Sequence, residues 1–180
     1  YQFNSVKYKL VDLPGTYSLL SASQDEEVAR DFILFGQPDC TIVVTDATAL
    51  ERNLNLVLQV MEITTHVVVA INLMDEARRK GIEVDARSLS RDLGIPAIPI
   101  TARAGEGVHT LLATVAEVIE GLVTTKPLRV AGTPEFQKAV NELVPMIEEM
   151  APGIPNARWL AIRLLDGDAR VQKALSSGEL

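Results

Sequence analysis

The chain has 180 residues, which is enough for one complete hydrophobic core, or for one domain of about 125 residues with a small appendage. Its net charge of −7 disfavours non-specific nucleic-acid binding and adsorption to anionic lipid, because both need clustered lysine and arginine side chains. The single cysteine, Cys40, excludes an intrachain disulfide. No apolar run reaches the roughly 18 residues of a membrane-spanning helix. We therefore do not expect this chain by itself to cross a bilayer, although it can belong to a protein that does.

The opening residues predict an antiparallel pair of strands. Residues 6–13 read VKYKLVDL, in which apolar and polar side chains alternate as they do along a β-strand. A short segment at residues 1–3 precedes them, and Asn4 and Ser5 between the two segments favour a tight hairpin turn.

Three apolar segments follow, at residues 40–45, 66–71 and 97–100. The first two are rich in β-branched residues and apolar throughout, which is typical of strands covered on both faces. Helical spacing of apolar residues is found around these segments, at residues 25–35, 50–63, 85–93 and 107–122. Strands that alternate with helices predict a mostly parallel α/β sheet, in which ligands bind beyond the carboxyl ends of the strands.

The C-terminal part of the sequence has helical patterns alone. Lys-Pro and Gly-Thr-Pro sequences within residues 124–134 predict a linker. Thr133 is placed to cap a helix over residues 134–150, and Pro145 inside that helix is expected to kink or interrupt it. Two further helices are predicted, at residues 156–165 and 168–175.

The first loop with candidate chemistry is Asp12-Leu13-Pro14-Gly15, at the end of the opening strand. The Asp12 carboxylate can hold a magnesium ion, usually through a water molecule. Gly15 lets a backbone N–H approach a terminal phosphate with no side chain in the way. The alternative is an ordinary turn at a strand end, since Pro-Gly is a common turn pair.

The second loop is Asn72-Leu73-Met74-Asp75, which follows the second apolar strand. The Asp75 carboxylate only accepts hydrogen bonds, so it can take both N–H donors of a guanine's pairing edge, a pair that adenine lacks. The Asn72 amide can serve the base and brace neighbouring loops, and Leu73 can pack against the base or the sugar. The alternative is a loop that caps the next helix, because Asn and Asp favour caps.

The third loop is Thr101-Ala102-Arg103, after the third apolar strand. A backbone N–H here, best placed at Ala102, can donate to the guanine O6 oxygen. Gly105 and Gly107 then give a flexible entry to the next helix. Taken alone, this segment is better interpreted as an ordinary loop between a strand and a helix.

Together the three loops favour nucleotide binding. All leave the carboxyl ends of predicted strands, in the order DxxG, NxxD and a Ser-Ala-Lys-like tripeptide. The spacing is 72 − 12 = 60 positions from Asp12 to Asn72 and 102 − 75 = 27 positions from Asp75 to Ala102. This order and spacing match the third, fourth and fifth motifs of small GTPases, so the sequence predicts a site for GTP or GDP with Mg²⁺.

Longer stretches resemble one family within this superfamily. Three stretches are similar to the cytoplasmic GTPase domain of ferrous iron transport protein B: DLPGTYSL at residues 12–19, LERNLNL at 50–56 and NLMDEA at 72–77. RWLAIRLLDGD at residues 158–168 is similar to the helical domain that follows it in that family. The resemblance covers nearly all of the chain.

The resemblance implies a small-GTPase-like P-loop NTPase fold, with a mostly parallel sheet and one antiparallel strand, over residues 1–125. A small all-α domain over residues 126–180, thought to favour the GDP-bound state, would follow it. The implied role is GTP binding and hydrolysis at the cytoplasmic face of the bacterial inner membrane, in partnership with the transporter's own membrane domain, which carries ferrous iron. Homo-oligomers are possible partners, and nucleic acid is not expected.

Two other functions stay open at this point. A ribosome- or RNA-associated GTPase of the same superfamily is disfavoured by the acidic charge and the lack of a basic patch. A regulatory or interaction module that no longer binds nucleotide is the other alternative.

The sequence departs from the family in one respect. The phosphate-binding loop G-x-x-x-x-G-K-[ST] and the first switch, whose Thr holds magnesium, do not occur within it. We therefore expect the chain to be a segment of a longer polypeptide, with about 50 further residues before Tyr1 and an uncovered apolar strand edge in this segment alone. A well-folded, GTP-binding sample with an intact mass of 19.6 kDa would contradict this expectation.

Gly15 and Thr16 are the candidate catalytic positions. The Gly15 N–H is expected to sense the γ-phosphate, and residues 16–27 are expected to form a second switch that loosens after hydrolysis. Thr16 stands where Ras-like GTPases carry a glutamine that orients the attacking water. Because no substitute is evident, we expect slow intrinsic hydrolysis.

Overall fold

The computed structural model describes residues 1–19, 23–129, 131–154 and 156–177. It divides into two compact units, Tyr1–Leu128 and Arg129–Leu180, which are described separately. The sequence placed the boundary after residue 125. The first unit extends further because Lys126 donates its backbone N–H to the Gly94 carbonyl at 2.8 Å. None of the helices in the described ranges combines the length and the apolar character that a membrane span requires.

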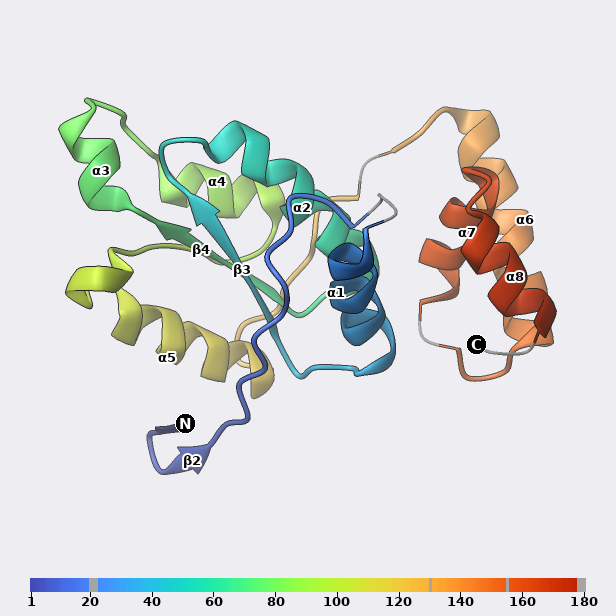
Figure 1. Cartoon of the computed structure of the whole chain (residues 1–180), viewed down its shortest axis with the longest axis horizontal. Coiled ribbons are helices and arrows are strands. Elements are labelled where there is room, and N and C mark those ends of the chain that lie inside the picture. The colour runs from blue at the N-terminus through green and yellow to red at the C-terminus, as the bar shows by residue number, and fades with distance from the viewer. Residues whose placement is uncertain (20–22, 130, 155, 178–180) are drawn as a thin grey trace. The chain divides into compact units, whose positions relative to one another are not determined.

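Three parallel strands form the sheet of the first unit, in the order β3-β4-β5, at Thr41–Asp46, Val67–Asn72 and Ala97–Pro99. Figure 1 shows α2 and α4 on one side of this sheet and α5 on the other. The helices of this unit are α1 (Gln24–Phe35), α2 (Leu50–Ile63), α3 (Met74–Arg79), α4 (Ala86–Leu93) and α5 (Val108–Ile119). The three predicted strands and the four predicted helices around them are thus confirmed within a few residues. Helix α3 was not predicted from the sequence.

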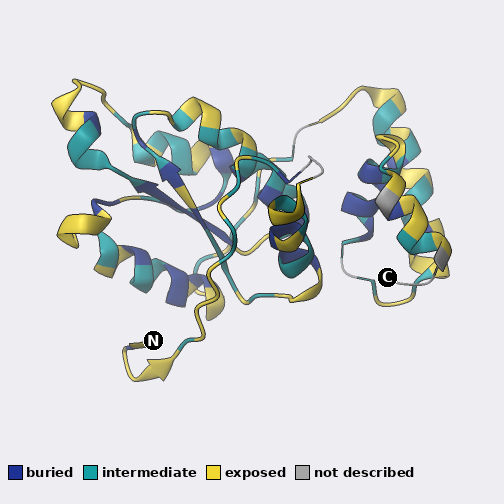
Figure 2. Ribbon diagram, in the orientation of Figure 1, coloured by how far each residue is buried: buried dark blue, intermediate teal, exposed yellow. Residues whose placement is uncertain are grey.

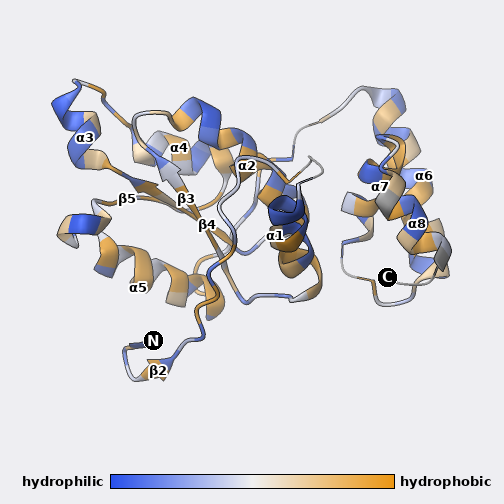
Figure 3. Cartoon of the chain, viewed as in Figure 1, coloured by the Kyte–Doolittle hydropathy of each residue, from blue (hydrophilic) through white to orange (hydrophobic). Residues whose placement is uncertain are grey.

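Strand β4 forms the centre of the core. Each of residues 67–71 has 0% exposed surface, because β3 and β5 flank the strand and helices cover both faces. Leu111, Val115 and Val118 follow the helical spacing of α5 and pack against Val68 and Ala70 of β4. Figures 2 and 3 show this buried, apolar band along the strands. Each fully buried side chain of this size contributes about 1.5–3 kcal/mol of hydrophobic stabilisation.

The opening strand is shorter than its alternating pattern predicted. The hairpin is present: β1 (Gln2–Phe3) pairs antiparallel with β2 (Val6–Lys7), and Asn4 and Ser5 form the turn with φ of 46° and 66°. Residues 8–16, however, have no regular secondary structure. The antiparallel element is therefore a separate hairpin and not a strand of the main sheet.

The outer edge of the sheet is apolar and open. Strand β3 ends the strand order, and its Val44 side chain is 61% exposed. Leu10 and Val11, in the segment that was expected to be a strand, are also exposed. Alternation in the sequence marked this segment as able to form a strand, but a strand also needs a hydrogen-bonding partner.

The second unit consists of helices in its described residues: α6 (Pro134–Met150), α7 (Ala157–Leu165) and α8 (Ala169–Ser177). As predicted, Thr133 caps α6, its side-chain oxygen accepting the Phe136 N–H at 3.3 Å. Pro145 was expected to kink or interrupt α6; it does not interrupt the helix, which continues through it. Asn141, whose carbonyl loses its helical donor to Pro145, is exposed, so water can take the place of that donor.

A buried ion pair joins α7 to α8. The Arg163 side chain is only 9% exposed and donates to Asp168 Oδ2 from Nη2 at 2.8 Å and from Nε at 3.1 Å. Asp168 in turn accepts the Val171 N–H on its other oxygen at 3.2 Å, which caps α8. Arg163 also donates to Asp166 at 3.1 Å.

We predict that Arg163→Ala destabilises the second unit by about 3–5 kcal/mol, because it leaves the Asp168 carboxylate buried without its cation. Urea unfolding followed by circular dichroism measures this loss. The control is Lys138→Ala, which removes an exposed ion pair to Glu142 and is expected to cost about 0.5 kcal/mol or less. Equal losses in the two variants would contradict the prediction.

Candidate functional site

The second loop begins where β4 stops being buried. Asn72 is the last residue of the strand, opposite Asp46 of β3. Leu73 then has φ 62° and ψ 32°, a left-handed conformation that is uncommon for a branched residue and is found preferentially at functional sites. This turn starts α3 at once, so Asp75 lies in the first turn of that helix.

The second and third loops are joined by a hydrogen bond. The Ala102 N–H donates to Asn72 Oδ1 at 3.0 Å. The contact links positions 30 residues apart and agrees with the bracing role expected of the Asn72 amide. It also occupies the N–H that the sequence assigned to guanine O6, so a base that takes this donor must displace the Asn72 oxygen.

Glu106 closes the third loop. Its backbone carbonyl accepts the Thr101 N–H at 2.9 Å, and its carboxylate accepts the Thr101 hydroxyl at 3.0 Å. The same carboxylate oxygen accepts Arg78 Nη2 at 2.7 Å. The hydrogen bond from Arg78 lowers the pKa of Glu106 and the bond to Glu106 raises the pKa of Arg78, so both are charged at neutral pH.

Gly107 lets the third loop close tightly. Its φ is 77°, and a Cβ atom built there would lie 2.4 Å from the Pro99 carbonyl oxygen. The sequence assigned Gly107 to flexibility, but its role in the structure is a close approach of two backbone segments. Arg103, the third member of the predicted tripeptide, is exposed in the short helix η1 (Ala102–Ala104).

The segment after the first loop is fixed to α2. The Arg52 guanidinium lies 4.3 Å from the centre of the Tyr17 ring. Gln59 accepts the Leu19 N–H at 2.6 Å and the Ser18 hydroxyl at 3.2 Å. The Thr16 hydroxyl is bonded locally, donating to the Ser18 carbonyl and accepting the Ser18 N–H. Residues 20–22 of the predicted switch lie outside the described residues.

A cavity of about 290 Å³ lies at the carboxyl ends of β3 and β4, between the segment that follows the first loop and the start of the second loop. Tyr17 lines it from the segment after the first loop, and Asn72 and Leu73 line it from the second. Asn53 from the LERNLNL stretch is also in its wall, where it accepts the Asp46 N–H at 3.0 Å and holds the end of β3.

The other predicted residues lie outside this cavity. The Asp75 carboxylate is 28% exposed and lies 3.6 Å from Arg79 on the same helix. The Asp12 carboxylate is exposed and makes no hydrogen bond or ion pair with any residue that the structure describes. The wall of the 290 Å³ cavity also lacks Leu13, Pro14, Gly15, Met74 and Thr101.

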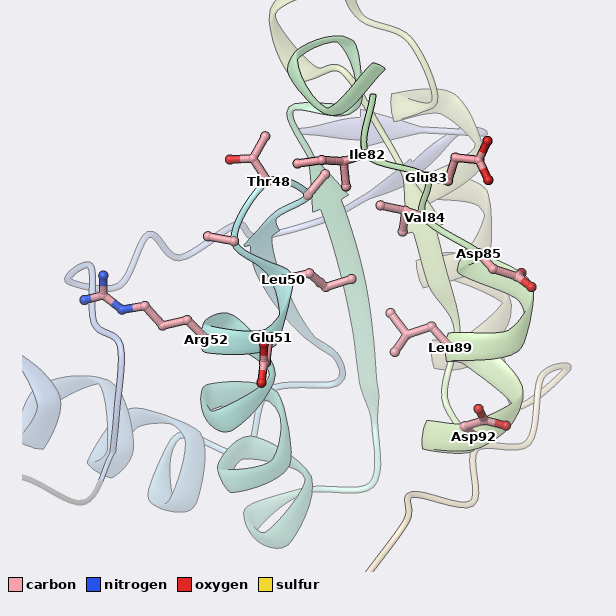
Figure 4. A pocket seen from close by; sticks show the side chains of 12 residues that line it. Thr48, Leu50, Glu51, Arg52, Ile82, Glu83, Val84, Asp85, Leu89 and Asp92 are labelled. Carbon is pink, nitrogen blue, oxygen red and sulfur yellow. The ribbon is translucent and has the colours of Figure 1, made fainter. Parts of the chain in front are cut away.

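A larger cavity, of about 560 Å³, lies beside the first between α2 and α4. Figure 4 shows Leu50 and Leu89 pointing into it from opposite sides. Its rim carries four carboxylates, those of Glu51, Glu83, Asp85 and Asp92, and one guanidinium, that of Arg52. The Ser88 N–H holds the pKa of Asp85 below its usual range, so this rim is anionic and unsuited to phosphates. Despite its size, we do not assign the nucleotide to this cavity.

Neither the lone cysteine nor a clustered metal site offers alternative chemistry. Burial, with the nearby Asp39 charge, raises the pKa of the Cys40 thiol to about 12, so it stays protonated. Within the described ranges, no three His, Cys, Asp or Glu side chains gather as a metal site would require.

Two family models match the chain. The model described as ferrous iron transport protein B matches residues 1–115, and the one described as FeoB cytosolic helical domain matches residues 133–180. The Fe(2+) transporter FeoB of Escherichia coli (strain K12) is 36% identical over 180 residues, covering 93% of this chain and 22% of that protein. The chain thus spans about a fifth of the length of the curated relatives it matches.

Solved structures of this family resemble the chain along its whole length. The cytosolic domain of the T. maritima FeoB iron transporter in a GDP form matches with a TM-score of 0.88 and 28% identity, covering 100% of this chain and 70% of that one. Its GMPPNP form matches with a TM-score of 0.84 and 29% identity over the same shares. These matches confirm the predicted small-GTPase-like fold with a helical domain. The chain belongs to the ferrous iron transport protein B family.

Proposed function

We propose that this chain is the larger part of the GTP-binding and GTP-hydrolysing domain of a ferrous iron transporter. The domain works at the cytoplasmic face of the bacterial inner membrane and acts on the transporter's own membrane domain. The observation that carries the proposal is the hydrogen bond between Asn72 and Ala102, which joins two loops whose sequences match guanine-binding motifs. Family membership and the GDP and GMPPNP forms of the T. maritima relative support it.

Guanine recognition is assigned to the second and third loops. Asp75 accepts the two N–H donors of the base, and Ala102 turns its N–H from Asn72 to the O6 oxygen. Leu73, in the wall of the 290 Å³ cavity, packs against the base or sugar, and Met74, Thr101 and Arg103 complete the two loops. The Arg79 guanidinium lies 3.6 Å from the Asp75 carboxylate. Because the Arg79 side chain is 63% exposed, it can move into solvent when the base binds Asp75.

The first loop is assigned to the phosphate end, where a magnesium ion would neutralise charge on the phosphates. Mg²⁺ typically uses one or two carboxylates together with substrate phosphates and water, and the unpartnered, exposed Asp12 carboxylate fits that pattern. Leu13 and Pro14 lead to Gly15, where a Cβ atom would meet no atom within 4 Å, so its N–H can be approached closely.

Hydrolysis is expected to be slow. Thr16 has a single hydroxyl hydrogen, and it is already donated to the Ser18 carbonyl, so Thr16 does not orient an attacking water in this conformation. Gln59, whose carboxamide contacts this segment, is engaged with Ser18 and Leu19. Thr16 and Gln59 therefore contribute little to water activation in this conformation.

We predict that Asp75→Asn lowers affinity for GDP and raises affinity for XDP, by about tenfold or more each. An Asn side chain keeps one acceptor oxygen for one N–H of the base. Its NH2 group replaces the second acceptor, and this group can donate to the xanthine O2 oxygen but faces a donor in guanine. Competition titration against a fluorescent nucleotide measures both constants. Asp85→Asn, on the rim of the anionic cavity, serves as the control and should leave selectivity unchanged. Unaltered selectivity in Asp75→Asn would refute the assigned contact.

We also predict that Gly15→Ala keeps its thermal unfolding midpoint while losing preference for GTP analogues over GDP. The added methyl group has free space in the fold but blocks close approach of the γ-phosphate. Affinities for GMPPNP and GDP, with the unfolding midpoint measured in parallel, test this. An unchanged GMPPNP to GDP ratio would remove Gly15 from the site.

A further inference from the structure

We propose that Arg78 and Glu106 are positioning residues that lock the two halves of the base pocket together and so set how long a guanine nucleotide stays bound. The inference rests on the proposed function. It assigns a role to two side chains that lie outside the three predicted loop motifs. Arg78 and Glu106 are 28 positions apart in the sequence.

Arg78 is held at both ends. Its Nε donates to the Met74 carbonyl at 3.2 Å, within α3, and its Nη2 donates to Glu106 Oε2 at 2.7 Å. A guanidinium bonded through two nitrogens has a fixed orientation. Because Asp75 lies one turn earlier in the same helix, the bond to Glu106 also fixes the helix that presents the base-binding carboxylate.

Glu106 transmits this restraint to the third loop. Its carboxylate and its backbone carbonyl both hold Thr101, at 3.0 Å and 2.9 Å, and Thr101 is only 4% exposed. The next residue is Ala102, whose N–H points at Asn72. Releasing Glu106 would therefore free the direction of the Ala102 N–H without disturbing the strands beneath.

The exposure of the pair argues against a role in global stability. The two side chains are 58% and 57% exposed, and ion pairs this exposed add little to the free energy of unfolding. Their effect should be local: it fixes the geometry of a loop that must grip and release a ligand.

The test measures the dissociation rate of fluorescent GDP from the unaltered protein, Glu106→Gln, Arg78→Gln and the double variant. We expect each single variant to release GDP about two- to fivefold faster, and the double variant to release it no faster than the singles, with unfolding midpoints unchanged. The variant Arg78→Lys, which keeps a cation for Glu106, should release GDP more slowly than Arg78→Gln. The matched control is Arg91→Gln, which removes an exposed ion pair to Asp92 on α4 and should change nothing.

Hydrogen exchange of the Ala102 amide, measured without nucleotide, separates the possible failures. Faster exchange together with faster GDP release supports the proposal. Faster exchange with unchanged release overturns the proposal and leaves the proposed function intact. So do additive single variants, or an Arg78→Lys variant that releases GDP as fast as Arg78→Gln. If a polypeptide that carries both this chain and a phosphate-binding loop binds no guanine nucleotide, the proposed function fails and the inference falls with it.

Discussion

The complete burial of strand β4 is the constraint on which the rest of the first unit depends. With no exposed surface over residues 67–71, the strand has one position between β3 and β5, and its register fixes where the chain next meets water. That point is Asn72. The left-handed Leu73 follows at once, so the side chains assigned to guanine recognition directly follow the most buried strand of the sheet.

The two ends of the proposed nucleotide site differ in how far they are formed. The base end is held by the Asn72 to Ala102 bond and by the contacts of Glu106, which join the loops that follow β4 and β5. The phosphate end is a segment without regular secondary structure, anchored mainly beyond Gly15 through Tyr17 and Arg52. A base end held by hydrogen bonds, beside a phosphate segment without regular secondary structure, would suit a switch in which the two loops read nucleotide identity and the segment reads nucleotide state.

Much of this fold could be predicted because β-branched runs and helical spacing are local signals: α2 begins and ends at the predicted residues. Helix α3 was missed because it has six residues, mostly charged, and starts from a backbone conformation that Leu rarely adopts. The opening strand was predicted too long, since alternation does not reveal whether a partner strand is present. Arg78 and Glu106 were missed because only the folded chain brings them together.

The central claim is that three loops meet around one guanine nucleotide, and amide NMR of the protein titrated with GDP and Mg²⁺ tests it most directly. The account predicts that the Gly15, Asp75 and Ala102 resonances shift together along a single saturation curve. Shifts confined to one loop, or centred on Glu83 and Leu89 in the anionic cavity, would contradict it.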